Sequence, residues 1–212
     1  MPPLTALQLQ VQLAERAPNE AARSAAFTDL KAGLARAHHL VAQLLTLARQ
    51  EPGAFPAEHA ALRLDALAQS VVADFALLAS ERGIDLGIAH VDEVTLNGHA
   101  DTLRILLGNL IDNALRYTAA GGHVTCRVNA NPHTVLFEVE DNGIGITDEQ
   151  AELVFERFYR RNSHVAGSGL GLAIVGDICR AHLAHISLHD GAQGGLKVRV
   201  SFVLADRRTQ TS

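Results

Sequence analysis

The sequence predicts an α+β protein, in which a two-layer α/β sandwich, a mixed sheet with helices on one face, follows an antiparallel helical hairpin. Apolar residues recur at helical spacing through residues 4–50, whereas short alternating runs typical of strands appear only after residue 62. Between these regions, residues 51–56 hold two prolines and a glycine, which end a helix. We therefore expect a helical hairpin at 1–50, a linker at 51–61, a mixed domain at 62–205 and a C-terminal tail at 206–212.

The composition excludes several classes of function. The 212 residues carry 18 Lys and Arg against 23 Asp and Glu, a net charge of −5, and the basic residues are dispersed, so no nucleic-acid partner is expected. The two lysines, Lys31 and Lys197, are not part of a G-x-x-x-x-G-K-S/T phosphate loop, and no H-E-x-x-H or G-x-S-x-G motif occurs. Any phosphate chemistry must therefore do without a phosphate-loop lysine.

The cysteines and the hydropathy pattern bear on the compartment. Cys126 and Cys179 lie far apart and lack metal-ligand spacing, so we expect both to be reduced core residues of a cytoplasmic protein. No apolar run approaches the roughly 18 residues that a membrane-spanning helix needs, and the first residues lack a signal-peptide pattern. The sequence predicts no membrane segment within this chain.

The first 50 residues are expected to form two helices. Apolar residues such as Leu4, Leu7 and Val11 recur at helical spacing up to Ala17-Pro18-Asn19-Glu20, which breaks the pattern, and a second helical run extends from about 24 to 50. Two antiparallel helices bury too little apolar area to be stable alone. We therefore expect the apolar stripe to pack against a second copy, as a homodimer.

Beyond the linker, helical and strand-like runs alternate. The runs 124–128 and 135–139 alternate apolar and polar residues and are separated by Asn129-Ala130-Asn131-Pro132, which is typical of a β-hairpin. Helical spacing predicts helices at 65–81, 100–117 and 169–183. Further strands are expected at 62–64, 84–89, 94–96, 186–188 and 196–204.

Asn109, Asn113 and Arg116 share one face of the helix predicted at 100–117, because residues three and four apart are neighbours on a helix. Amide oxygens suit a magnesium ion that already has phosphate ligands. This face therefore indicates a site for a metal and phosphate. The alternative is a pair of asparagines that merely face solvent.

Asp141 follows the strand predicted at 135–139 and precedes Gly143 and Gly145, which allow a close approach of the backbone to a ligand. Its carboxylate can accept a hydrogen bond from the exocyclic amino group of adenine, which guanine does not present in the same place. A plain Asp-Asn-Gly turn is the alternative for this segment.

The stretch from Gly167 to Gly171 precedes a predicted helix, so its backbone N–H groups and the helix N-terminus can hold phosphate without lysine. Residues 160–166 are polar and without periodicity, which predicts a mobile lid anchored by Phe155 and Phe158. The three histidines that follow lack an acidic or thiol partner at ligand spacing, and we expect them to be core or surface residues: His182, His185 and His189.

Four segments, in this order, resemble the N, G1, F and G2 boxes of the sensor histidine kinases, members of the gyrase, Hsp90, histidine kinase and MutL ATP-binding superfamily. They are Asn109-Leu110-Ile111-Asp112-Asn113, Asp141-Asn142-Gly143-Ile144-Gly145, Phe155-Glu156-Arg157-Phe158-Tyr159 and Gly167-Ser168-Gly169-Leu170-Gly171-Leu172. The resemblance covers about Leu62 to Leu204. It implies an ATP-binding catalytic domain that transfers the γ-phosphate to a histidine, for relay to an aspartate of a response regulator.

The resemblance also implies roles for single residues, with ATP and Mg²⁺ as ligands. Asn113 is the implied magnesium ligand, Asn109 lies near the triphosphate, Arg116 pairs with its oxygens and Asp141 specifies adenine. The ATPase branch of the superfamily typically has a glutamate at the position of Asn109, and an amide cannot act as a general base, so transfer is favoured over hydrolysis. The implied ATP-binding residues are Asn109, Asn113, Arg116, Tyr117, Asp141, Gly143, Gly145, Ile146, Gly167, Ser168, Gly169, Leu170 and Gly171.

The phosphoacceptor motif of the family is the main departure. Family members carry H-E-x-R/K-T/S-P-L at the start of the first hairpin helix, and only Pro3-Leu4 matches the tail of this motif. The acceptor histidine would fall before residue 1, and His38 and His39 lack its context. We therefore expect a truncated hairpin with a weakened dimer, no self-phosphorylation, and a parent protein anchored in the bacterial inner membrane.

Two other functions remain open from the sequence. A stand-alone serine kinase of the anti-sigma-factor kind has the same ATP boxes, but such kinases lack a helical hairpin before them. A non-catalytic dimerisation or regulator-binding module could keep a nucleotide as a structural ligand. A phosphoryl-transfer assay with a separately supplied acceptor hairpin distinguishes these from a histidine kinase.

Overall fold

The computed structural model describes residues 59–159 and 169–204, together with residues 11–12, 15–16, 18–20, 22–23 and 26–27. By its internal contacts the chain divides into two units, Met1–Gln50 and Glu51–Ser212. The expectations for most of the hairpin, for residues 51–58, for the lid and for residues 205–212 lie outside the described residues. Within the described part of the chain, no helix is both long and apolar enough to cross a membrane.

The described residues of the first unit are helical on both sides of a bend at Pro18 and Asn19. Asn19 accepts a hydrogen bond from the Ala22 backbone N–H through its Oδ1 atom, at 2.8 Å. A side-chain acceptor at this place satisfies one of the unpaired N–H groups at the start of a helix. The break expected at residues 17–20 is therefore the start of a capped helical segment.

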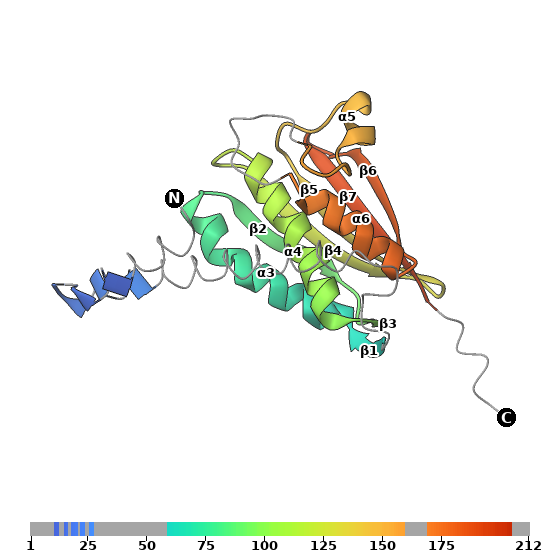
Figure 1. Cartoon of the computed structure of the whole chain (residues 1–212), viewed down its shortest axis with the longest axis horizontal. Coiled ribbons are helices and arrows are strands. Elements are labelled where there is room, and N and C mark those ends of the chain that lie inside the picture. The colour runs from blue at the N-terminus through green and yellow to red at the C-terminus, as the bar shows by residue number, and fades with distance from the viewer. Residues whose placement is uncertain are drawn as a thin grey trace. The chain divides into compact units, whose positions relative to one another are not determined.

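The second unit is built on a five-stranded mixed sheet with strand order β2-β4-β5-β7-β6 (Figure 1). Only the pair β2 and β4 is parallel, whereas the other three pairs are antiparallel. The strands are β2 (Asp85–Val91), β4 (His123–Ala130), β5 (Thr134–Asp141), β6 (His185–Asp190) and β7 (Leu196–Val203).

Three helices cover one face of this sheet (Figure 1). They are α3 (Leu64–Glu81), α4 (Ala100–Tyr117) and α6 (Gly171–Ala181). Two short strands, β1 (Ala60–Arg63) and β3 (Thr95–Gly98), form a separate antiparallel pair, and α5 (Asp148–Leu153) follows β5. This arrangement confirms the predicted α+β sandwich with helices on one face.

The core lies between the helices and the sheet, because alternate residues of each strand point to the covered face. On β5 these are Val135, Phe137 and Val139, all at most 2% exposed. Cys126 and Cys179 are buried and free, as expected for core residues, and burial raises the pKa of each thiol to about 12. Leu103, Leu106, Leu107, Leu110 and Ile111 bring α4 into the same core.

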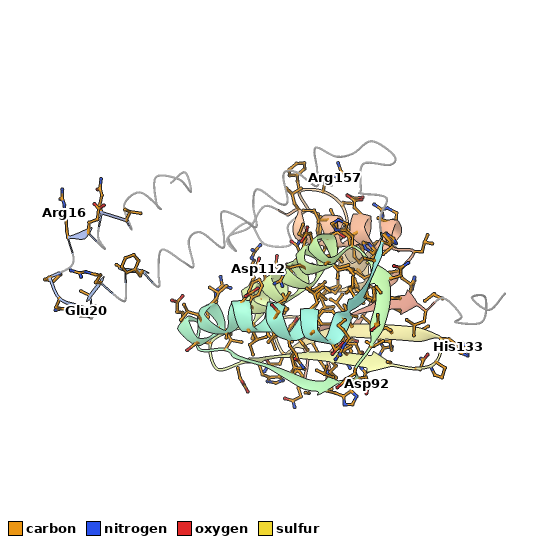
Figure 2. All side chains as sticks on the ribbon, turned by 90° about the horizontal axis from the view of Figure 1, so that it is seen from below. Arg16, Glu20, Asp92, Asp112, His133 and Arg157 are labelled. Atoms are coloured by element: carbon orange, nitrogen blue, oxygen red, sulfur yellow. The ribbon has the colours of Figure 1, made fainter. Side chains whose placement is uncertain are left out.

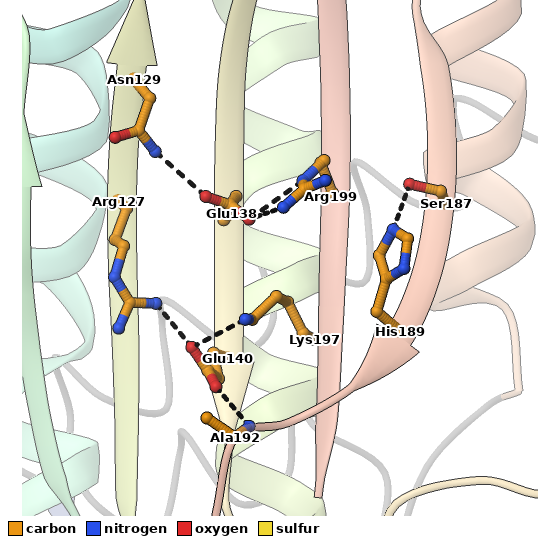
Figure 3. A network of polar contacts seen from close by, with 9 residues as sticks. All are labelled: Arg127, Asn129, Glu138, Glu140, Ser187, His189, Ala192, Lys197 and Arg199. Carbon is orange, nitrogen blue, oxygen red and sulfur yellow. Dashed lines mark hydrogen bonds and ion pairs between the residues drawn. The ribbon is translucent and has the colours of Figure 1, made fainter.

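The opposite face of the sheet carries charged residues (Figure 3). Glu138 accepts hydrogen bonds from Arg199 and Asn129, and Glu140 pairs with Arg127 and Lys197. Both glutamates are less than 10% exposed although no helix covers them, since the long basic side chains lie over them. In Figure 2, the labelled Asp92 and His133 lie along the sheet, whereas Asp112 and Arg157 lie on the helix side.

Several element bounds differ from the sequence-based expectation. Leu64 was expected in a strand but begins α3, with Arg63 as its N-cap residue. The last helix is shorter than predicted, because Gly169 and Leu183 have positive φ angles of 70° and 52°. The sequence reading missed α5, although Thr147 and Gln150 form a capping box at its start, a pattern that is recognisable in a sequence.

Candidate functional site

One group of candidate residues lies around Asp141, at one end of the sheet. Asp141 is the last residue of β5 and pairs there with Val124, near the start of β4. It was expected just after this strand, but its pairing with Val124 of β4 extends β5 to include it. Strand alternation directs Asp141 to the same face as Phe137 and Val139, the face that the helices cover.

The carboxylate of Asp141 is held by backbone donors. Its Oδ1 atom accepts hydrogen bonds from Gly143 N, at 2.9 Å, and from Leu196 N, at 3.3 Å. The residue is only 6% exposed. Among the described residues no donor contacts Oδ2, so this second oxygen is available to a ligand.

Burial raises the pKa of the Asp141 carboxyl above its ordinary value, and the neighbouring Glu140 raises it further. The two N–H donors and His123 lower it, but the net direction is upward. A further donor on Oδ2 would favour the ionised form, because hydrogen bonds to a carboxylate stabilise its charge. The site therefore favours a ligand that brings an N–H group to Asp141.

Two glycines after Asp141 allow close contacts with other elements. A Cβ atom on Gly143 would lie 2.2 Å from the carbonyl oxygen of Tyr117, the last residue of α4. Gly145 has a φ of 59°, and a Cβ atom there would lie 3.0 Å from the carbonyl oxygen of Gly195. Only glycine fits at Gly143 in this packing, so the segment after Asp141 is fixed to α4.

The asparagine face of α4 lies beside the start of α6. Asn109 is 3% exposed and donates through Nδ2 to the Ile105 carbonyl oxygen, at 2.8 Å. Its Oδ1 atom lies 3.1 Å from the position that a Cβ atom of Gly171 would take. The structure thus brings together Asn109 and the glycine that begins α6, which the sequence places 62 residues apart.

Asn113 and Arg116 occupy the following turn of α4 and are both partly exposed. The Arg116 guanidinium forms an ion pair with the carboxylate of Asp112, one turn earlier on the same helix. The sequence reading did not identify this partner, although the i, i+4 spacing is a known signal. Among the described residues, none forms a hydrogen bond with the carboxamide of Asn113, and its neutral oxygen is a suitable donor for Mg²⁺.

A backbone hydrogen bond joins the F box to the residue two positions before α6. Phe158 donates its backbone N–H to the carbonyl oxygen of Gly169, at 2.9 Å, and both residues have positive φ angles. Phe155 contacts α6 near Gly176, whereas the Phe158 side chain is 70% exposed. Gly167 and Ser168, expected in the phosphate loop, lie outside the described residues.

Three histidines were expected to be core or surface residues, and the structure shows their surroundings. His182 stacks on His59, with ring centroids 5.0 Å apart, and its Nε2 atom accepts the backbone N–H of His99, at 3.2 Å. Burial lowers the pKa of His182. His185 and His189 are exposed on β6, so these histidines are packing or surface residues, as expected.

Comparison with protein families gives one match for this region. Residues 98–206 match the family described as histidine kinase-, DNA gyrase B-, and HSP90-like ATPase, which includes α4, Asp141 and α6. The match covers just over half of the chain. The chain belongs to this ATPase family.

Curated relatives that the chain resembles include a sensor protein kinase and a sensor protein. The sensor protein kinase PmrB of Pseudomonas aeruginosa is 36% identical over 93% of this chain and 42% of its own length. The sensor protein QseC of Escherichia coli K12 is 37% identical over 94% of this chain and 44% of its own length. The chain therefore spans less than half the length of these relatives.

Solved structures agree with this assignment. The cytoplasmic segment of the histidine kinase QseC is 29% identical, with a TM-score of 0.57 over 80% of this chain and 94% of that structure. The mycobacterial sensor histidine kinase MprB is 26% identical, with a TM-score of 0.60 over 68% of this chain and 97% of that structure. The described domain is therefore similar in fold to these two histidine kinase structures.

Proposed function

We propose that this chain is the catalytic part of a sensor histidine kinase, which transfers the γ-phosphoryl group of ATP to a histidine for relay to a response regulator. The observation that carries the proposal is Asp141. It is a buried carboxylate with Oδ1 held by two backbone donors and Oδ2 open, at the end of the sheet where α4 and β5 meet. An acceptor placed in this way suits the exocyclic amino group of adenine.

The remaining ATP contacts follow from the residues around Asp141. Gly143, Gly145 and Ile146 would line the base, with Tyr117 beside it. At the start of α6, from Gly169 to Gly171, the backbone N–H groups would face the phosphates. The N-terminus of a helix favours negative charge. Asn109 lies against this N-terminus and would position the phosphate groups.

Asn113 would hold Mg²⁺ through its carboxamide oxygen, and the bound metal would supply neutralisation of phosphate charge. Arg116 can contribute a further positive charge, because its ion pair with Asp112 leaves other guanidinium N–H groups available. Catalysis then consists of positioning: a bond forms between the acceptor imidazole nitrogen and the γ-phosphorus, the bond to the bridging oxygen breaks, and ADP leaves.

The acceptor must be supplied to this chain. None of its histidines lies in a phosphoacceptor motif, and Asn109 stands where a hydrolytic relative would need a general base. We therefore propose that the 212-residue chain binds Mg-ATP without phosphorylating itself. As partners we propose a second copy through residues 1–50 and a response-regulator receiver domain, with the cytoplasmic side of a membrane-anchored parent as the location.

The substitution Asp141→Asn tests the proposal. We expect a loss of ADP affinity of about 1–3 kcal/mol, because the amide can present a donor where an acceptor is needed and leaves a buried group unpaired. Isothermal titration calorimetry with ADP measures this loss. Asp74→Asn, on the exposed side of α3, is the matched control and should bind ADP like the wild type. Unchanged affinity in Asp141→Asn would remove Asp141 from the adenine role.

A further inference from the structure

The turn between β6 and β7 carries three glycines, at positions 191, 194 and 195, and no side chain that suggests chemistry. Gly191 donates its N–H to the Gly195 carbonyl oxygen and Gly194 donates to the Gly191 carbonyl oxygen, both at 3.2 Å. The Ala192 N–H donates to Glu140 Oε1, at 2.7 Å, as Figure 3 shows. The turn is therefore held by hydrogen bonds between its own residues, and it is anchored to β5 next to Asp141.

The same turn contacts Asp141 directly. The Leu196 N–H donates to Asp141 Oδ1, and the backbone at Gly195 packs against the aspartate. A Cβ atom on Gly195 would lie 2.1 Å from the Asp141 carbonyl oxygen and 2.7 Å from Oδ1. Real Cβ atoms do not approach other atoms so closely, and here one of the obstructing atoms is backbone. Any side chain at Gly195 must therefore displace Asp141.

The orientation of a carboxylate decides which of its oxygens a ligand meets. Asp141 ends a strand, and its side chain could rotate if no donor held it. Gly143 N and Leu196 N approach the same oxygen, from the segment after β5 and from the β6–β7 turn. Because both donors hold Oδ1, the plane of the carboxylate is fixed and Oδ2 is presented to the ligand.

We propose that Gly195, together with the backbone N–H of Leu196, is a positioning element that orients Asp141 for recognition of the adenine amino group. This inference rests on the function proposed above for Asp141. Gly195 itself touches no ligand. It acts by leaving space for the Asp141 backbone and carboxylate, so a side chain at Gly195 reduces base discrimination without removing any ligand contact.

The chain offers a matched control in the neighbouring residue. Gly194 and Gly195 have φ angles of 83° and 78°, so an alanine is similarly strained at either position. A Cβ atom on Gly194, however, would meet no atom within 4 Å. The variants Gly194→Ala and Gly195→Ala therefore share the strain of the turn and differ in the contact with Asp141.

The test compares the affinities for ADP and for inosine diphosphate, which lacks the exocyclic amino group, by calorimetry on the full chain. We expect Gly195→Ala to lower the ratio of ADP to inosine diphosphate affinity at least about tenfold, and Gly194→Ala to leave this ratio unchanged. In an Asp141→Asn background, Gly195→Ala should cause no further change in the ratio. Equal ratios in the two alanine variants would overturn the inference.

The outcomes also separate this inference from the proposed function. If Asp141→Asn leaves the ratio at its wild-type value, the adenine role of Asp141 fails, and the positioning role fails with it. If Asp141→Asn lowers the ratio and Gly195→Ala does not, only the positioning role is wrong.

A second measurement covers the case in which Gly195→Ala does not fold. Hydrogen exchange of the Leu196 amide should be slow in the wild type and at least about tenfold faster in Asp141→Ala, which has no side-chain oxygen to accept this N–H. The Gly194 amide, which donates to Gly191 instead, should exchange equally in both proteins. An unchanged Leu196 amide would show that its N–H does not hold Asp141, and would contradict the proposal.

Discussion

Asn109 and Asn113 are the same residue type one turn apart on α4, yet their environments differ. Asn109 is buried and donates to the Ile105 carbonyl oxygen, so it is part of the packing between α4 and α6. Asn113 is partly exposed, with no hydrogen bond from its carboxamide to another described residue. A substitution at Asn113 is therefore a cleaner test of ligand binding than one at Asn109.

Asn113→Ala should weaken binding of Mg-ATP by about tenfold, roughly 1.4 kcal/mol, and leave metal-free adenosine binding nearly unchanged. Only the end of the ligand that carries metal and phosphate loses a contact. Titration of both ligands measures the difference, with Asn97→Ala on the exposed strand β3 as a control. An equal loss for both ligands would indicate a local change of structure and would argue against a role in metal binding.

The start of α3 shows how one charged residue joins several elements. Asp65, in the first turn of α3, is 3% exposed and accepts hydrogen bonds from the Arg63 side chain at the end of β1. It also accepts the backbone N–H of Val94, just before β3, at 3.2 Å. Asp65 therefore links α3 to the small β1–β3 sheet.

The Arg63 hydrogen bond lowers the pKa of Asp65 from 3.8 to about 2, against the opposing effect of burial. A lowered pKa gives stability that is present above the unfolded-state value and is lost as the pH falls from about 4 towards 2. We expect a loss of about 1 kcal/mol in the free energy of unfolding, since water screens the half-exposed Arg63. Urea titrations at pH 7 and pH 3 measure it.

The control for the pH effect is Asp65→Asn. This variant keeps an oxygen for the Val94 N–H but has no charge to titrate. Other carboxylates also titrate in this range, so the quantity of interest is the difference between the two proteins. That difference should shrink as the pH falls, and a difference that stays constant between pH 7 and pH 3 would contradict the assigned pKa.

At the scale of the whole molecule, the proposed ATP site lies in the second unit, and only Pro3-Leu4 matches the phosphoacceptor motif of the resembled family. The chain should therefore bind Mg-ATP and yet incorporate no label from γ-labelled ATP, because no nucleophile is held in line at about 3–3.5 Å from the phosphorus. Acid-lability analysis of the incubated protein is the measurement. Acid-labile label on His38 or His39 would make the second helix the acceptor.

A separately supplied acceptor hairpin provides the positive control for this experiment. Label on that hairpin, with none on the chain itself, is the result expected of a histidine kinase catalytic domain. Absence of transfer despite normal ADP affinity would favour the non-catalytic, nucleotide-binding module as the function. Label on a serine would favour the serine-kinase alternative.

The sequence by itself determined the order of elements and most of the ligand-binding candidates. Helix α4 occupies the predicted range 100–117, because its apolar face recurs at helical spacing. The same holds for the β4–β5 hairpin and for Asp141 at its end. Periodicity is a property of neighbouring residues, so it is readable without knowledge of the fold.

Tertiary structure alone decided which of these residues meet. Gly195 lies 54 residues after Asp141, and no residue type at Gly195 or Leu196 suggests a role at the site. Their contact exists because β5 pairs with β7, with Glu140 opposite Lys197, a register that places the β6–β7 turn beside the end of β5. Likewise, α4 and α6 pack on the same face of the sheet, which brings Asn109 to Gly171. Strand register and helix packing depend on burial across the whole domain, and no local pattern in the sequence encodes them.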